Sequence, residues 1–396
     1  MTAVMKGVRI VEVAEQAFGP AACALLSDWG ADVIKIEPVE KGDAGRGLRA
    51  LGNDDVLPLF ESNNRGKRSL GLDLSTEEGQ DILYRLVADA DIFVTNKVPR
   101  VRKRLNIDVD DIRRCNPNII YARATGNGER GPEADNGSYD LLGFWYRTGA
   151  ALGAAPAGSP PPYLPSPGFG DLIGATTIAA GLMGALYHRA TTGEAPVVDV
   201  SLLATGMWAM SGSISSAALT REWSWPPPAR NPLSHTYETA DHRWIGLCCL
   251  QPASYWAPLC EVLGRPDLIT DPRFADFGSL MANAGQVMDI LAGIFAKEKL
   301  EHWRTVLADF KGQWTVIQDP VQVLDDPQVA ANGLVQTCTT EAGVPFDLVT
   351  APVQYDGQPA VARRGPGLSE HGDAILSDLG YDWDTVVDLK VRGVVA

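Results

Sequence analysis

Short strand-like and helix-like segments alternate along the first two hundred residues, and this alternation constrains the fold more than any other feature. The strand-like segments are GVRIVEVA at 7–14, ADVIKIEP at 31–38, KRSLGLDL at 67–74, DIFVTN at 91–96 and NIIYARATG at 118–126. Helical patterns lie between them, such as GPAACALLSDWG, which has a proline near its start and a glycine past its end. Such alternation indicates parallel strands with crossover helices on both faces. We therefore expect an α/β fold with a Rossmann-like, doubly wound parallel sheet.

Polar segments follow several of these strands. They are AEQAFGP at 14–20, VTNKVPR at 94–100 and ATGNGERGP at 124–132. In a doubly wound sheet the ligand lies at the carboxyl ends of the strands. The sequence therefore predicts that these polar, glycine-bearing and partly basic segments form the rim of a binding site.

The pattern changes after about residue 130, where glycine and proline accumulate as far as residue 170. Long structureless loops are usually functional or disordered, and we expect this one to lead into a helix that begins at Asp171. A strand at 196–202 and a proline-rich stretch at 220–234 follow. We expect a large domain from residues 1–205 and 326–396, a linker at 206–226, and a small α+β domain at 227–325.

The charge of the chain limits its partners. The formal net charge is −15, which argues against nucleic acid because phosphate backbones require a basic face. Two runs are locally basic, NNRGKRSL at 63–70 and NKVPRVRKRL at 96–105, and the second holds Lys97, Arg100, Arg102, Lys103 and Arg104 with no acid among them. A basic island on an acidic protein fits a small polyanion, although a solvated basic helix face has the same pattern.

Several common site types have no counterpart in the sequence. The six cysteines form no CxxC pair and the five histidines no HxxxH or HExxH pattern, so we predict no metal site. The first strand-to-helix turn lacks GxGxxG, which disfavours NAD and FAD. No P-loop and no GxSxG segment occur. We see no signal peptide, and the most apolar helix, IGATTIAAGLMGALY, is too short to cross a bilayer, so we expect a cytoplasmic protein without membrane association.

Asp171 lies between a glycine-rich segment and a small-residue helix, in PSPGFGDLIGATTIAAGL. One interpretation is a helix cap, which stabilises a helix by about 1 kcal/mol. The other is a nucleophile, because a carboxylate can attack an acyl carbonyl to form a mixed anhydride. The flanking glycines would then clear the approach and supply N–H donors, and the helix N-terminus would favour ionisation.

At this point the chain resembles the class III CoA-transferases, the group of the formyl-CoA and carnitine-CoA transferases, to which the α-methylacyl-CoA racemases are related. The resemblance covers nearly the full length. It rests on GVRIVEVAEQAFGPAACALLSDWGADVIKIEP, NNRGKRSLGLDL, DIFVTNKVP, NIIYARATGNGERGP, GFGDLIGATTIAAGLMGALYHRATTGEAPVVDVSL and LCEVLGRPDLITDPRFA, in that order.

The resemblance implies an acyl-CoA:carboxylate CoA-transferase that forms an interlocked homodimer. Its nucleophile would be Asp171, acylated as an anhydride and then converted to an aspartyl-CoA thioester, with coenzyme A as substrate. The family's CoA contacts correspond here to Gln16, Ala17, Asn64, Arg65, Gly66, Lys67, Asn96, Lys97, Val98 and Arg104.

Departures from the family pattern leave alternatives open. Pro38 stands where the family often has an arginine near the adenine, and Arg46 is the nearest substitute. Gly137 replaces a lysine contact. The racemases have a His-Asp pair where this chain has Tyr139 and Asp140, and a tyrosine with a pKa near 10 is a poor base. A 2-methylacyl-CoA racemase and a non-catalytic CoA-thioester binding protein, with Asp171 as a cap, remain the other two interpretations.

Overall fold

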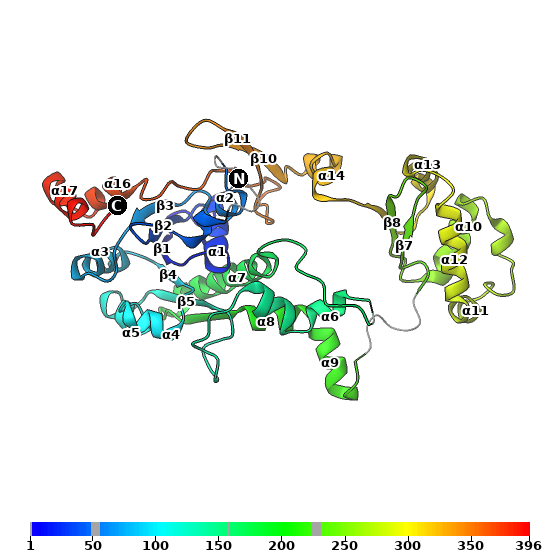
Figure 1. Ribbon diagram of the computed structural model, residues 1–396, viewed down its shortest axis with the longest axis horizontal. Coiled ribbons are helices and arrows are strands. Elements are labelled where there is room, and N and C mark those ends of the chain that lie inside the picture. The colour runs from blue at the N-terminus through cyan, green and yellow to red at the C-terminus, as the bar shows by residue number, and fades with distance from the viewer. Residues whose placement is uncertain (1, 49–55, 157, 224–230) are drawn as a thin grey trace. The chain divides into compact units, whose positions relative to one another are not determined.

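The computed structural model describes residues 2–48, 56–156, 158–223 and 231–396. The chain divides into two compact units, Met1–Thr220 with Gln328–Ala396 and Arg221–Pro327. Each unit has its own core of buried apolar side chains. Figure 1 shows the elements of both units along the chain.

The larger unit is built on a parallel sheet of six strands. These are β1 (Arg9–Val13), β2 (Asp32–Glu37), β3 (Arg68–Gly71), β4 (Ile92–Thr95), β5 (Ile120–Thr125) and β6 (Val197–Ser201). Their order across the sheet is β3-β2-β1-β4-β5-β6, and all neighbours are parallel. The predicted α/β fold with a parallel sheet is confirmed. The order reverses between β1 and β4, and ligands of open α/β sheets bind outside the carboxyl ends at such a switch point.

Helices on both faces of this sheet pack against it. The helices of the larger unit are α1 (Phe18–Asp28), α2 (Pro58–Asn64), α3 (Glu77–Ala88), α4 (Pro99–Arg104), α5 (Val109–Cys115), α6 (Ala150–Ala154), α7 (Phe169–Thr192), α8 (Leu202–Ala209), α9 (Ser211–Thr220), α15 (Pro327–Ala331), α16 (Gly372–Asp378) and α17 (Trp383–Val391), with the 3₁₀ helix η1 (Ala44–Gly47) and the π-helix η3 (Leu141–Tyr146). Helices α1 and α7 pack in one core cluster, and α3, α5, α16 and α17 in the other. Alternate side chains of each strand point to opposite faces. Accordingly Ile10 packs in the cluster with α1 and α7, whereas Val11 packs in the cluster with α3, α5, α16 and α17.

The C-terminal segment packs beside β3 in the larger unit. Leu72, just after β3, pairs with Val395 at the C-terminus. The hydroxyl of Ser69 accepts a hydrogen bond from the backbone N–H of Ser369. α16 therefore lies beside β3, as Figure 1 also shows.

Helix α7 has 24 residues and is long and apolar enough to cross a membrane by length and composition alone, so the expectation that it is too short was wrong. Core helices of proteins that enter no membrane pass the same test. Gly174, Ile178 and Leu182 of this helix are buried, and α7 packs against α1 and the sheet.

The smaller unit combines an antiparallel sheet with helices. Its strands are β7 (Thr236–Glu238), β8 (Trp244–Leu247) and β9 (Trp314–Ile317), in the order β7-β8-β9. Its helices are α10 (Pro252–Val262), α11 (Phe277–Ala282), α12 (Ala284–Phe295), α13 (Leu300–Val306) and α14 (Pro320–Leu324), with the turns η4 (Pro266–Leu268) and η5 (Leu307–Asp309).

Some segments differ from the sequence prediction. The expected irregular loop at 130–170 contains η3 and α6. The expected linker at 206–226 is helical as far as Thr220, because Ser201 caps α8 and the following stretch is rich in alanine and free of proline. Residues 224–226 of that linker lie outside the described residues. A further antiparallel pair, β10 (Val335–Thr339) and β11 (Pro345–Val349), was not predicted.

Candidate active site

Asp171 lies in the first turn of α7, but it does not cap the helix. Helix α7 begins at Phe169, and its N-cap residue is Gly168, which makes no side-chain cap hydrogen bond. Asp171 is thus the third residue of the helix, so the cap interpretation is wrong. Its side chain is half-buried, and no hydrogen bond holds it among the described residues.

The two glycines before Asp171 have conformational and packing roles. Gly168 has φ +74°, in the left-handed region that side chains disfavour. At Gly170 an added Cβ would lie 2.5 Å from Cγ of Phe144. The backbone of the first turn therefore packs directly on an aromatic ring. Gly170 is thus required by its contact with Phe144, a packing role that was not predicted.

The surroundings of Asp171 favour its protonated form. Burial raises the pKa of Asp171 to about 7, and the negative charge of Asp140 adds to the shift. We had expected the helix N-terminus to favour ionisation, and here desolvation outweighs it. A carboxyl group with a pKa near neutrality in a partly open site is typical of a functional group.

Asp140, the second carboxyl group, is buried at the start of η3. Its Oδ1 accepts a hydrogen bond of 2.8 Å from the backbone N–H of Leu141. Its Oδ2 is buried and has no hydrogen-bond partner among the described residues. Burial raises the pKa of Asp140 as well. The site thus holds two carboxyl groups, and the charge of Asp140 opposes the ionisation of Asp171.

The loop between β1 and α1 lies beside the start of α7. A Cβ on Gly168 would be 3.8 Å from Cβ of Ala17. The preceding residue, Gln16, has φ +70°, which is uncommon for a residue with a side chain. Gln16 and Ala17, both predicted as site residues, are therefore close to the helix that carries Asp171.

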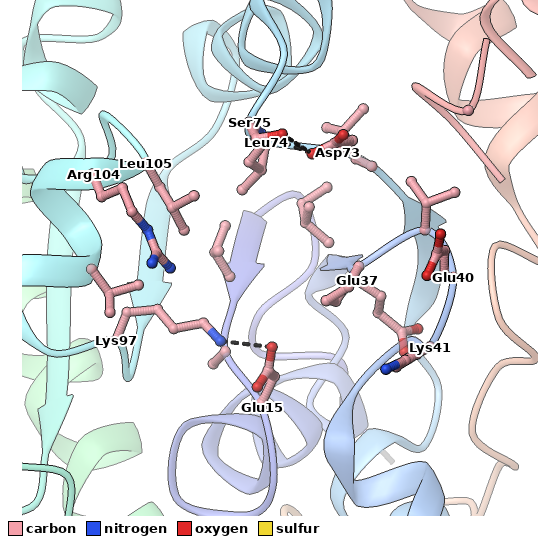
Figure 2. A pocket seen from close by; sticks show the side chains of 18 residues that line it. Glu15, Glu37, Glu40, Lys41, Asp73, Leu74, Ser75, Lys97, Arg104 and Leu105 are labelled. Atoms are coloured by element: carbon pink, nitrogen blue, oxygen red, sulfur yellow. Dashed lines mark hydrogen bonds and ion pairs between the residues drawn. The ribbon is translucent and has the colours of Figure 1, made fainter.

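The same loop also borders a cleft of about 590 Å³ at the carboxyl ends of the strands. The cleft is lined by Val13, Ala14, Glu15, Ile36, Glu37, Pro38, Val39, Glu40, Lys41, Leu72, Asp73, Leu74, Ser75, Lys97, Val101, Arg104, Leu105 and Gly393. Figure 2 shows its charged side chains at the rim. Because Ala14 and Glu15 line the cleft and Ala17 touches Gly168, one short loop joins the cleft to the start of α7.

Three cations border the cleft, and they differ in their partners. Lys97 pairs with Glu15 at 2.6 Å, as the dashed line in Figure 2 indicates. Neither Arg104 nor Lys41 forms an ion pair with any residue that the structure describes, and both are exposed. These two cations are available to an anionic ligand.

Among the other predicted contacts, the side chains of Asn64, Arg65 and Lys67 bond to other residues inside the protein. Arg65 pairs with Asp28 at 2.7 Å, and Lys67 pairs with Glu12 at 2.6 Å. Asn64 donates to the backbone carbonyl of Phe60, and Gly66 adopts φ +71°. None of the four lines the cleft. The basic appearance of this run reflects internal ion pairs.

Arg46 does not serve as the free cation expected in place of the missing arginine. Its guanidinium donates two hydrogen bonds of 2.7 Å to the carboxylate of Glu37. It also stacks over the ring of Phe60 at 4.1 Å. Lys41, which the sequence analysis missed, occupies the accessible position. It could have been found, because it follows β2 directly and carboxyl-end segments line such sites.

The remaining predicted residues lie on the turn after β4. The Asn96 side chain bonds the backbone of Glu15 on both sides, donating to its carbonyl at 2.6 Å and accepting from its N–H at 3.1 Å. Val98 precedes α4 as its N-cap.

In the described part of the chain no group of three His, Cys, Asp or Glu residues could hold a metal ion.

Known CoA-transferases are similar to this chain in sequence. The sequence model of CoA-transferase family III matches residues 5–372. The (R)-2-hydroxy-4-methylpentanoate CoA-transferase of Clostridioides difficile is 30% identical over 99% of both chains. The cinnamoyl-CoA:phenyllactate CoA-transferase of Clostridium sporogenes is 28% identical over 98% of this chain and 96% of that protein.

Solved structures agree with this family. A CAIB/BAIF family protein from Brucella suis is 27% identical and superposes with a TM-score of 0.84, covering 96% of this chain and all of the other. Rv3272 from Mycobacterium tuberculosis is 28% identical with a TM-score of 0.81, covering 93% and 98% of the two chains.

Proposed function

This chain belongs to CoA-transferase family III, and we propose that it moves CoA from a donor acyl-CoA to an acceptor carboxylic acid through covalent intermediates on Asp171. The observation that carries the proposal is the half-buried Asp171 carboxyl group. It has no hydrogen-bond partner among the described residues, its pKa is raised to about 7, and it lies next to a loop that borders a cleft.

The first half of the reaction exchanges one thioester for another. The Asp171 carboxylate attacks the thioester carbonyl of the donor, the C–S bond breaks, and CoA leaves as a thiolate. The thiolate then attacks the aspartyl carbonyl of the mixed anhydride. The donor acid leaves as a carboxylate, and Asp171 carries CoA as a thioester.

The second half repeats these steps with the acceptor. The acceptor carboxylate attacks the aspartyl-CoA thioester, and CoA leaves again as a thiolate. The thiolate attacks the acceptor carbonyl of the new anhydride, which releases acyl-CoA and the free Asp171 carboxylate. Each step consumes one anion and produces another, so no proton is gained or lost and no hydrolytic water is required.

The cleft supplies cations for the phosphates of CoA. Arg104 and Lys41 come from different sides of it and are unpaired among the described residues, whereas Lys97 is paired with Glu15 (Figure 2). The β1–α1 loop would guide the pantetheine arm from this cleft to Asp171. We assign Arg104 and Lys41 as the phosphate contacts, with Lys41 in the role first assigned to Arg46.

A trapping experiment tests Asp171 as the nucleophile. The protein is incubated with an acyl-CoA and hydroxylamine, and its peptides are analysed by mass spectrometry. We expect a hydroxamate on Asp171. Asp171→Asn, which preserves the shape of the side chain, should lose at least about a thousandfold in transfer rate because a covalent step is abolished. Transfer that continues while Asp171 remains unlabelled would contradict the mechanism.

Donor and acceptor should be tested as a matrix of acyl-CoAs and carboxylic acids. Because relatives are named for 2-hydroxy-4-methylpentanoate and phenyllactate, branched and aromatic 2-hydroxy acids belong in the first panel. Each donor is also incubated alone in deuterium oxide. Deuterium uptake at the α-carbon without an acceptor would indicate a racemase in place of a transferase.

A further inference from the structure

The backbone at Gln16 is held in a conformation that a side chain makes unfavourable. Its φ is +70°, and such a residue costs about 1–3 kcal/mol and persists only where its surroundings fix it. A glycine would adopt this conformation without that cost. The Gln16 side-chain amide forms no hydrogen bond within the described residues. The chain therefore keeps a strained residue whose amide is free to meet a ligand.

Four hydrogen bonds from other elements fix this loop. Asp43 accepts from the backbone N–H of Gln16 at 2.8 Å. Lys35 donates to the carbonyl of Ala14 at 2.9 Å. The Asn96 amide makes the remaining two, both to the backbone of Glu15. Every backbone position from 14 to 16 is thus bonded to a side chain from β2, from the turn after β2 or from the turn after β4.

A buried charge network supports two of these side chains. Lys35 pairs with Asp43 at 2.7 Å and with Glu12 at 2.8 Å. Lys67 pairs with the other oxygen of Glu12 at 2.6 Å. All four side chains are fully buried. Because buried and paired charges permit little movement, Asp43 presents a fixed acceptor to Gln16.

We propose that Asp43 and Asn96 are positioning residues, which hold Gln16 and Ala17 at the junction between the cleft and Asp171. This inference rests on the proposed function. Asn96 acts through the backbone of Glu15, to which both its amide nitrogen and its amide oxygen are bonded, and it need not touch CoA. The strain at Gln16 is the cost of directing its side chain toward the acyl group or the thioester sulfur.

The main test replaces Asn96 and compares it with a matched asparagine. Asn116 also ties backbone segments together, donating to the carbonyls of Val87, Ala88 and Ala90 away from the cleft. We expect Asn96→Ala to lower kcat at least about tenfold while KM for acyl-CoA changes less than about threefold, as for an interaction realised in the transition state. Asn116→Ala should lower the Tm at least as much and leave kcat within about twofold.

A second variant does not depend on the stability of the network. Gln16→Gly fits φ +70° without strain, so it should fold at least as well as the wild type, yet kcat should fall at least about tenfold. Asn tolerates the left-handed region and keeps an amide, so Gln16→Asn should retain more of the activity than Gln16→Gly.

The outcomes separate the two proposals. A wild-type protein that transfers CoA between no pair in the matrix would overturn the proposed function. An active wild type whose kcat survives both Asn96→Ala and Gln16→Gly would overturn the positioning proposal alone. An equal loss of kcat in the Asn96 and Asn116 variants would also overturn it, because the effect would then follow stability.

Discussion

The carboxyl group of Asp171 combines two requirements that oppose each other. It must be ionised to attack a thioester, yet burial and the neighbouring Asp140 raise its pKa to about 7. A poorly solvated carboxylate with few hydrogen bonds is more reactive than one in water, and a pKa near the working pH keeps a large fraction of it ionised. The elevated pKa is thus compatible with a nucleophile that acts near neutrality.

The first prediction concerns the pH dependence of Asp171 acylation. Because the carboxylate is the reactive form, the rate should fall on the acid side of about pH 7, approaching tenfold per pH unit. Asp140→Asn removes the smaller of the two causes, so the pKa of Asp171 should fall and the acid limb should move to lower pH by about one unit or less. Initial rates of acyl-enzyme formation between about pH 5 and pH 9 measure this limb.

The comparison uses each profile relative to its own maximum, so a general loss of activity does not obscure the shift. Tyr139→Phe serves as the control, because Tyr139 precedes Asp140 but is 64% exposed, and the change removes a hydroxyl group and no carboxyl group. An acid limb that stays in place or moves upward in Asp140→Asn would show that Asp140 does not influence Asp171.

The partners and roles of individual side chains were the hardest part of the site to predict. Asp171 could be singled out from its neighbours in sequence, since the glycine-Asp-helix pattern is local. The role of Arg65 and Lys67 could not, because their partners Asp28 and Glu12 are 37 and 55 residues away along the chain. Arg46 was misassigned for a related reason. Charge patterns show which side chains are cations, whereas burial and pairing are decided by the fold.

At the scale of elements, helix α7 is positioned by direct packing of its glycines on aromatic rings. Gly170 lies on Phe144, and at Gly174 an added Cβ would be 2.3 Å from Cε2 of Phe18 in α1. Small residues let α1 and α7 approach closely at the end of the helix that carries Asp171. Glycine in a helix costs about 1 kcal/mol relative to alanine. The close packing on Phe144 and Phe18 explains why glycine is present at these positions despite that cost.

The second prediction compares two glycines of this helix. Gly174→Ala should destabilise the protein by about 1–3 kcal/mol, because the new methyl group forces Phe18 out of place. Gly184→Ala is the matched control, since nothing lies within 4 Å of an added Cβ there, and it should stabilise by up to about 1 kcal/mol. Urea unfolding monitored by circular dichroism gives both values.

Phe18→Leu should recover part of the stability that Gly174→Ala loses, because it removes the atoms that collide. If both glycine variants changed stability by the same amount and in the same direction, packing on Phe18 would not explain Gly174.

Elements with a clear local pattern were predicted well. All six strands of the parallel sheet, and α1 and α3 between them, coincide with patterns of apolar residues and caps. The exceptions lacked such patterns. Strands β9, β10 and β11 have exposed residues on one side, so burial does not mark them. The start of α7 was placed two residues late, because Phe169 and Gly170 are poor helix formers that packing holds in the helix.

At the scale of the whole molecule, the larger unit has large apolar side chains that are exposed and not buried in its own core. The π-helix η3 and helices α7 and α8 pack together, and large apolar side chains on them are exposed. They include Tyr139, Leu142, Tyr146, Leu172, Ile173, Tyr187, Met207 and Trp208. Large apolar side chains exposed on elements that pack together are expected at an interaction site. We propose that a second copy of the chain covers it, as the resemblance to the interlocked CoA-transferases led us to expect.

The third prediction tests this assembly through Trp208, which is 81% exposed on α8. Trp208→Asp places a charge at the centre of an interface that would otherwise exclude water, so it should weaken the dimer by about 2 kcal/mol or more. Leu250→Asp is the control, because Leu250 is 70% exposed but belongs to the smaller unit and to none of these elements. Light scattering after size-exclusion chromatography gives the mass of each variant across a dilution series.

The wild type and Leu250→Asp should remain dimeric where Trp208→Asp is monomeric. A monomeric wild type, or a Trp208→Asp variant as dimeric as the wild type, would show that this surface is not the contact between copies. Because Asp140 directly precedes η3 and Asp171 lies in the first turn of α7, loss of the dimer should also lower transfer activity, which the same samples can report.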